Sequence, residues 1–175
     1  MWRDARARGV ALDVASVTGI TLVTAAVSQR WASLLLDAMF YASESVFGSA
    51  VTDRAVETSY YWTRLGYVVP VRALTTALGT WAGFEAFRIL LIAGLAAGLF
   101  AVARTFTRRL PAIAIVTPLT MSSVVLTFVG TSYLTGAVLA GTAVVIALGL
   151  RRGLWPHVAA GAVLGWLAMV NPPGL

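Results

Sequence analysis

The feature that most constrains this chain is an uncharged run of 41 residues, from Leu110 to Leu150. A membrane-spanning helix needs about 20 mostly apolar residues, so the run is too long for one span and fits two. The sequence GTSY, at 130–133, is the predicted turn, because Gly130 gives the backbone freedom and Tyr133 suits a membrane interface. The run therefore predicts a pair of spans at 111–129 and 133–150.

The composition of the whole chain also indicates an integral membrane protein. Of the 175 residues, 59% are hydrophobic and only 11% are charged, whereas soluble domains carry about 25% charged residues. The chain has no cysteine and one histidine, which excludes disulfides, thiolate metal sites and multi-histidine metal sites. The net charge of +6 does not indicate nucleic-acid binding, since the arginines lie mainly beside apolar runs.

Three further apolar segments predict spans at 10–29, 82–103 and 154–171. The last one is expected to end at the sequence NPPGL, because paired prolines stop a helix. Together with the uncharged run, they predict an all-α integral membrane fold with about five transmembrane helices. We expect a single domain over residues 1–175, with one long external loop at 30–80.

Arginine clusters set the predicted orientation. One cluster precedes the first span, one follows the second and one separates the last two: Arg3, Arg6 and Arg8; Arg104, Arg108 and Arg109; Arg151 and Arg152. Five spans would put all three clusters on one side of the membrane, and the positive-inside rule assigns that side to the cytoplasm. We therefore expect a multi-pass protein of the cell membrane with a cytoplasmic N-terminus and an external C-terminus.

The predicted external loop carries four of the seven acids and two amphipathic segments. In WASLLLDAMFYASESVFG, apolar residues recur at helical spacing, which favours a helix lying on the membrane. In YYWTRLGYVVPVRALTTALG, interfacial aromatic residues precede Pro70 and a second amphipathic turn. The loop is therefore predicted to be structured at the membrane surface.

Two interpretations of Asp37 stay open. Composition alone favours a solvated or capping carboxylate. The functional interpretation is a carboxylate at the outer membrane face that deprotonates an acceptor hydroxyl or holds a divalent cation, which makes such a cation a candidate cofactor. Glu44, seven residues later, is included with the predicted substrate-binding residues.

Three arginines are candidates for binding an anionic group. Arg64 and Arg72 could bind a lipid phosphate, since a guanidinium group matches phosphate oxygens bidentately. Arg88 lies three residues after Glu85, so the two side chains share a helix face. They form either a structural ion pair or part of a polar cavity that holds an anionic ligand.

Four stretches carry a family resemblance. LLLDAMFYASESVFG places an Asp soon after the first span, followed by an aromatic residue and a short helix. YYWTRLGYVVPVRALTTALGTWAGFEAFRILL contains R-x-G-Y-x-x-P and G-x-x-x-x-F-x-x-x-R. VGTSYLTGAVLAGTAVVIALGLRRG is a short turn with a helix and arginines, and AAGAVLGWLAMVNPPGL is a glycine-containing helix that ends near a proline. In this order they resemble the N-terminal part of the GT-C superfamily of membrane glycosyltransferases.

The resemblance implies a polytopic enzyme that takes a sugar from a polyprenyl-phosphate carrier at the outer face of the membrane. It implies Asp37 as the candidate catalytic base or metal-proximal acid. Many relatives carry a second acid after the third helix, where this chain has GTSY with Ser132. The expected partners are the lipid bilayer and a lipid-linked sugar donor.

A second hypothesis is a non-catalytic membrane subunit or scaffold of a larger complex, with a partner membrane subunit. The chain has two G-x-x-x-G pairs, Gly94 with Gly98 and Gly161 with Gly165. Glycines four apart let helix backbones approach closely in lipid. Packing within the chain is the plainer interpretation, and contact with another subunit is the alternative.

Overall fold

The computed structural model describes residues 2–28, 46, 64–129 and 134–171, and the side chains of residues 2–6 are outside this description. Every regular element within these ranges is a helix. The helices with their bounds are α1 (Trp2–Val27), α5 (Leu65–Leu78), α6 (Thr80–Phe106), α7 (Arg109–Thr120), α8 (Ser123–Phe128), α9 (Leu134–Gly149) and α10 (Leu154–Val170). The prediction of an all-helical fold is therefore confirmed for the described part of the chain.

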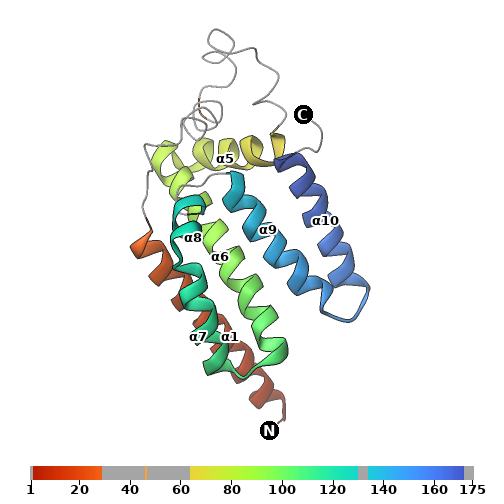
Figure 1. Cartoon of the computed structure of the whole chain (residues 1–175). Coiled ribbons are helices and arrows are strands. Elements are labelled where there is room, and N and C mark those ends of the chain that lie inside the picture. The colour runs from red at the N-terminus through yellow and green to blue at the C-terminus, as the bar shows by residue number, and fades with distance from the viewer. Residues whose placement is uncertain (1, 29–45, 47–63, 130–133, 172–175) are drawn as a thin grey trace.

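The helices form a bundle with one helix across its end. Figure 1 shows α1, α6, α7 with α8, α9 and α10 running lengthwise, while α5 crosses one end. The N-terminus and the α6–α7 and α9–α10 connections lie at the opposite end. We call the end that α5 crosses the α5 end. We call the opposite end the basic end, because it carries Arg8, Arg104, Arg108, Arg109, Arg151 and Arg152. The arginine clusters thus share one end of the molecule, as the sequence predicted for one side of a membrane.

Two helices of the described chain are long and apolar enough to cross a membrane: Ala7–Val27 within α1, and α6. This finding weakly supports a membrane protein. The helices α9 and α10 have 16 and 17 residues and are therefore about 24 and 25 Å long, against about 30 Å for a hydrocarbon core. The five predicted spans are not confirmed, and the predicted GTSY turn lies outside the described residues.

The predicted span 111–129 is two helices in the structure. Pro118 lacks an N–H group, which leaves the helix without one of its internal hydrogen bonds. Two residues after α7 ends, Ser122 adopts an extended backbone, and its side chain accepts a hydrogen bond from the Val125 amide at 3.5 Å. This serine cap starts α8 as a separate helix.

The helix α6 lies at the centre of the core. One of its faces packs with α5 and α9 through a cluster that includes Tyr67, Phe87, Leu91 and Leu134. A second cluster joins α6 to α1 and α7 through Ile20, Ala96, Phe100, Ala112 and Val116. At its start, Gly79 has a φ of +85°, a conformation that glycine adopts without strain, and there the chain turns from the crosswise α5 into α6.

The two glycine pairs have different surroundings. A Cβ atom at Gly98 would lie 2.6 Å from the backbone carbonyl carbon of Ala143, and one at Gly94 would lie 3.9 Å from the Ala140 Cβ. The first pair therefore packs α6 against α9, which confirms the interpretation of packing within the chain. A Cβ atom at Gly161 or Gly165 would meet nothing within 4 Å, so the second pair faces open space on α10.

We expect Gly98→Ala to destabilise the protein, because the added methyl group forces α6 and α9 apart. Overpacking of this kind costs about 1–3 kcal/mol. The matched control is Gly161→Ala, which makes the same change in the middle of a helix with open space around it and should be neutral or slightly stabilising. Thermal unfolding of both variants in the same detergent measures the difference, and equal melting temperatures would contradict the close approach of α6 and α9.

Candidate functional site at the α5 end

The two acids predicted to serve the site, Asp37 and Glu44, lie outside the described residues. Val46 is described; it is helical and packs against the core cluster shared by α5, α6 and α9. Ser28, at the end of α1, and Arg64, just before α5, are the described residues that flank this part of the chain, and both helix ends lie at the α5 end of the bundle (Figure 1). The acid-bearing segment is therefore attached to the bundle at this end.

Arg88, on α6, joins its own helix to the end of α1. Its side chain is 4% exposed, and its Nε donates to Glu85 Oε2 at 3.0 Å, with a second contact from Nη2 to Oε1. Its Nη1 donates to the backbone oxygen of Ala25 at 3.1 Å and to the Ser28 hydroxyl. The structural ion pair predicted from the sequence is confirmed, and Arg88 also closes the C-terminus of α1. Whether Arg88 binds an anionic substrate stays a prediction.

Arg64 performs a similar function at the end of α10. Its side chain is buried, and Nη1 donates to the Val170 backbone oxygen at 3.4 Å and to the Asn171 side-chain oxygen. Carbonyl groups in the last turn of a helix have no partner within that helix, so Arg64 supplies one. The predicted contact of Arg64 with a lipid phosphate is not tested by these interactions.

A tryptophan completes the junction between α5 and α10. Pro70 lies inside α5 and has no N–H, so the carbonyl of Gly66, four residues earlier, lacks its usual donor. The Trp166 indole Nε1 of α10 donates to this oxygen at 2.7 Å. A Cβ atom at Gly66 would lie 2.6 Å from the Val170 amide nitrogen, so a glycine is needed for α10 to pack this closely.

Arg72 differs from the other two arginines. It is exposed on α5, and its side chain makes no hydrogen bond or ion pair with the described residues. Among Arg64, Arg72 and Arg88, it is therefore the one whose guanidinium group is open to an added ligand. On the buried side of α5, the Tyr67 ring packs edge-on against Phe87 with centroids 5.3 Å apart. Burial raises the pKa of the Tyr67 phenol, which keeps its hydroxyl protonated near neutral pH.

A polar seam runs between α1 and α7 toward this end. The hydroxyls of Thr24 and Thr120 are hydrogen-bonded at 3.0 Å in the interior. Beyond them, a cavity of about 230 Å³ is lined by Val27, Ser123, Leu126 and Thr127. None of these lining residues ionises, so the cavity offers hydroxyl groups and apolar surface rather than charge. Among the described residues there is no group of three His, Asp or Glu side chains that could hold a metal ion.

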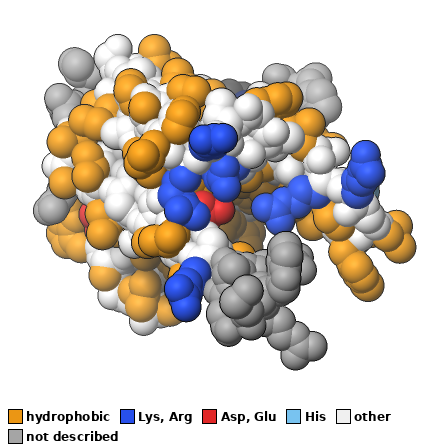
Figure 2. Space-filling model, turned by 90° about the horizontal axis from the view of Figure 1, so that it is seen from below, with side chains coloured by type: hydrophobic (Ala, Val, Ile, Leu, Met, Phe, Trp, Pro, Cys, Tyr) orange, Lys and Arg blue, Asp and Glu red, His pale blue; other side chains and the backbone are white. Residues whose placement is uncertain are grey.

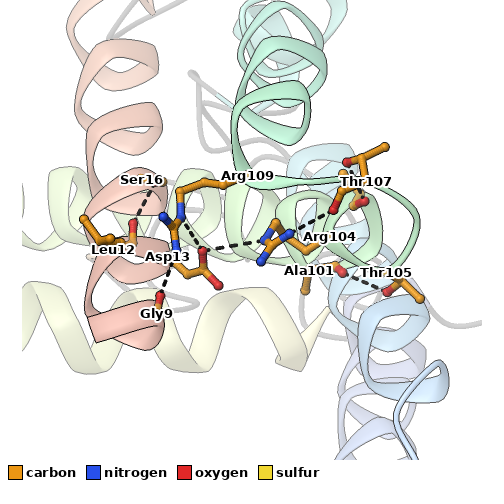
Figure 3. A network of polar contacts seen from close by, with 10 residues as sticks. Gly9, Leu12, Asp13, Ser16, Ala101, Arg104, Thr105, Thr107 and Arg109 are labelled. Carbon is orange, nitrogen blue, oxygen red and sulfur yellow. Dashed lines mark hydrogen bonds and ion pairs between the residues drawn. The ribbon is translucent and has the colours of Figure 1, made fainter. Parts of the chain in front are cut away.

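A polar network at the basic end was not predicted from the sequence. Figure 3 shows Asp13 of α1 between Arg109 of α7 and Arg104 of α6. Asp13 Oδ1 lies 2.9 Å from Arg109 Nε and 3.6 Å from Arg104 Nε. An acid inside an apolar run could have indicated this contact, because ionised groups in membrane helices are usually paired.

We expect Trp166→Phe to weaken the junction of α5 with α10, because the buried Gly66 carbonyl loses its donor. The loss is about 1–3 kcal/mol. In a Pro70→Ala background, the residue 70 amide can bond to this carbonyl, so the same tryptophan substitution should cost much less. A double-mutant cycle on thermal unfolding measures the coupling, and additive effects would mean that the indole does not replace the missing helix hydrogen bond.

Comparisons with known proteins identify no relative. No family model, curated protein or solved structure matches this chain. The function is therefore proposed from the residues and their geometry.

Proposed function

We propose that the chain is a multi-pass membrane protein whose basic end faces the cytoplasm. Large apolar side chains are exposed along the lengthwise helices, among them Leu22, Leu90, Val124, Ile146 and Leu164. Large exposed apolar surfaces mark sites of contact with a membrane or another protein. All three arginine clusters belong to one end of the bundle (Figure 1), which supports the predicted orientation.

We further propose that it is a GT-C-like glycosyltransferase, or the N-terminal module of one, that acts at the outer face. The observation that carries this proposal is the position of α5 across the end of the bundle opposite the basic end. The segment with Asp37 and Glu44 is attached at that end through Ser28 and Arg64. A carboxylate there would meet both a lipid-linked donor in the outer leaflet and an acceptor from outside.

In the proposed reaction, Asp37 takes the proton of an acceptor hydroxyl. The acceptor oxygen forms a bond to the anomeric carbon of the sugar, while the bond from that carbon to the lipid phosphate breaks. The phosphate oxygen keeps the bonding electrons, and the exposed Arg72 guanidinium is the best-placed described group to stabilise its charge. Arg64 and Arg88 then act mainly by holding the ends of α10 and α1 near the site.

The second candidate function is a non-catalytic subunit of a larger membrane complex. One observation favours it: Gly161 and Gly165 present a bare face of α10, which would allow close packing by a helix of another chain. In this alternative, Asp37 is an ordinary surface carboxylate. The two functions are separated by the response of sugar transfer to substitution of Asp37.

The orientation predicts the labelling of single cysteines, for which the cysteine-free chain is a clean background. The two positions are Thr76 on α5 and Thr105 near the basic end of α6, both exposed. In intact cells, a membrane-impermeant maleimide should label Thr76→Cys, and it should label Thr105→Cys only after permeabilisation. The reverse pattern would contradict the orientation, and labelling of both positions in intact cells would contradict a membrane between them.

We expect Asp37→Asn to abolish sugar transfer, because the amide cannot accept the acceptor's proton. Loss of a general base typically lowers the rate by about 10²–10⁴-fold. The assay uses the full chain in proteoliposomes with polyprenyl-phosphate-linked hexoses and pentoses. The matched control is Asp53→Asn, the same change at another acid of the segment, which should retain activity.

If the wild-type chain transfers sugar and Asp37→Asn transfers it equally fast, Asp37 is not the base. If the wild-type chain transfers none of the donors, alone or with the partner that co-purifies with it, the subunit function is favoured.

A further inference from the structure

The basic end has a concentration of positive charge that the proposed reaction does not use. Figure 2 views this end directly and shows arginine side chains gathered around an acidic one. Arg8, Arg108, Arg151 and Arg152 are exposed. They come from α1, the α6–α7 connection and the α9–α10 connection. None forms an ion pair with an acid of the described chain.

Asp13, the acid at this end whose side chain the structure describes, is already paired with arginines. Arg109 and Arg104 both lie against Asp13, as described above, and each is fixed by a second bond. Arg109 Nη2 donates to the Gly9 oxygen at 3.3 Å, and Arg104 Nη1 donates to the Thr107 oxygen at 2.8 Å (Figure 3). These two arginines are therefore held in place, and their pairing with Asp13 leaves the exposed arginines without an acidic partner among the described side chains.

Large apolar side chains lie next to these arginines in the chain. Phe106, Leu110, Leu154 and Trp155 are between 74% and 78% exposed. Phe106 and Leu110 flank Arg108 by two residues, while Leu154 and Trp155 follow Arg152 closely. Arginine beside an exposed tryptophan and aliphatic residues matches the boundary of a bilayer, where phosphate groups lie above acyl chains.

We infer that the basic end binds anionic phospholipid, with Arg108, Arg151 and Arg152 on the lipid phosphates and the adjacent apolar side chains on the acyl chains. A guanidinium group pairs bidentately with phosphate oxygens, and the two connections lie at the same end of the bundle (Figure 1). This interaction depends on the proposed membrane placement but not on sugar transfer. It would hold α6, α7, α9 and α10 at a fixed depth relative to the headgroups.

The test is native mass spectrometry of the full chain released from mixed micelles of phosphatidylglycerol and phosphatidylcholine. The wild-type chain should retain phosphatidylglycerol preferentially, and this preference should fall with added salt. Each arginine removed should weaken it about fivefold, so Arg151→Gln/Arg152→Gln should lose more than Arg108→Gln. The control Thr76→Gln places the same glutamine at an exposed position of the opposite end without removing a charge, and it should keep the full preference.

Circular dichroism of each variant checks that it is folded. We expect every variant to fold, because the substituted side chains are exposed. Equal retention of the two lipids by the wild-type chain would overturn the inference. The same holds if the double variant keeps the wild-type preference, or if soluble glycerol phosphate displaces the lipid, because the site would then bind free phosphate. Sugar transfer is not measured in this test, so its outcome is separate from that of Asp37→Asn.

Discussion

Backbone carbonyls at the C-terminus of a helix have no partner within the helix, and this fold satisfies several of them with arginines. Arg88 of α6 bonds to Ala25 near the end of α1, and Arg64 bonds to Val170 at the end of α10. Arg104 bonds to Thr107 just past the end of its own helix. A positive charge at a helix C-terminus also interacts favourably with the partial negative charge of the helix dipole at that end. In a lipid environment, where water cannot serve these groups, such contacts fix how the helices end and meet.

These helix-end contacts affect the interpretation of Arg64 and Arg88, which the sequence analysis singled out as candidates for binding an anionic group. A guanidinium group near the outer membrane face has the chemistry of a phosphate ligand, and residue type alone does not distinguish this from a helix cap. The two cases are distinguished by whether the end of another helix lies within hydrogen-bond distance of the guanidinium group. Arg64 meets Val170, which is 106 residues away, whereas Arg72, eight residues later, faces outward. Of the three arginines predicted to bind an anionic group, Arg72 is therefore the exposed one, whereas Arg64 and Arg88 are buried.

Features set by local sequence were predicted well, and those set by distant contacts were not. Apolar runs located α1, α6, α9 and α10 to within a few residues at most ends, and the spacing of Glu85 and Arg88 gave their ion pair. The split of 111–129 was missed because the serine cap after Pro118 outweighs a continuous apolar pattern. The pairing of Asp13 with Arg109 spans 96 residues and had no local signal beyond an acid in an apolar run. The acids of the proposed site lie outside the described residues, so their predictions rest on the sequence.

The two ends of the bundle differ in how their described arginines are paired. At the basic end, Asp13 is paired with Arg104 and Arg109, while Arg8, Arg108, Arg151 and Arg152 are exposed. At the α5 end, the buried arginines Arg64 and Arg88 are occupied by backbone oxygens and by Glu85, which leaves Arg72 as the exposed arginine among the described residues of this end.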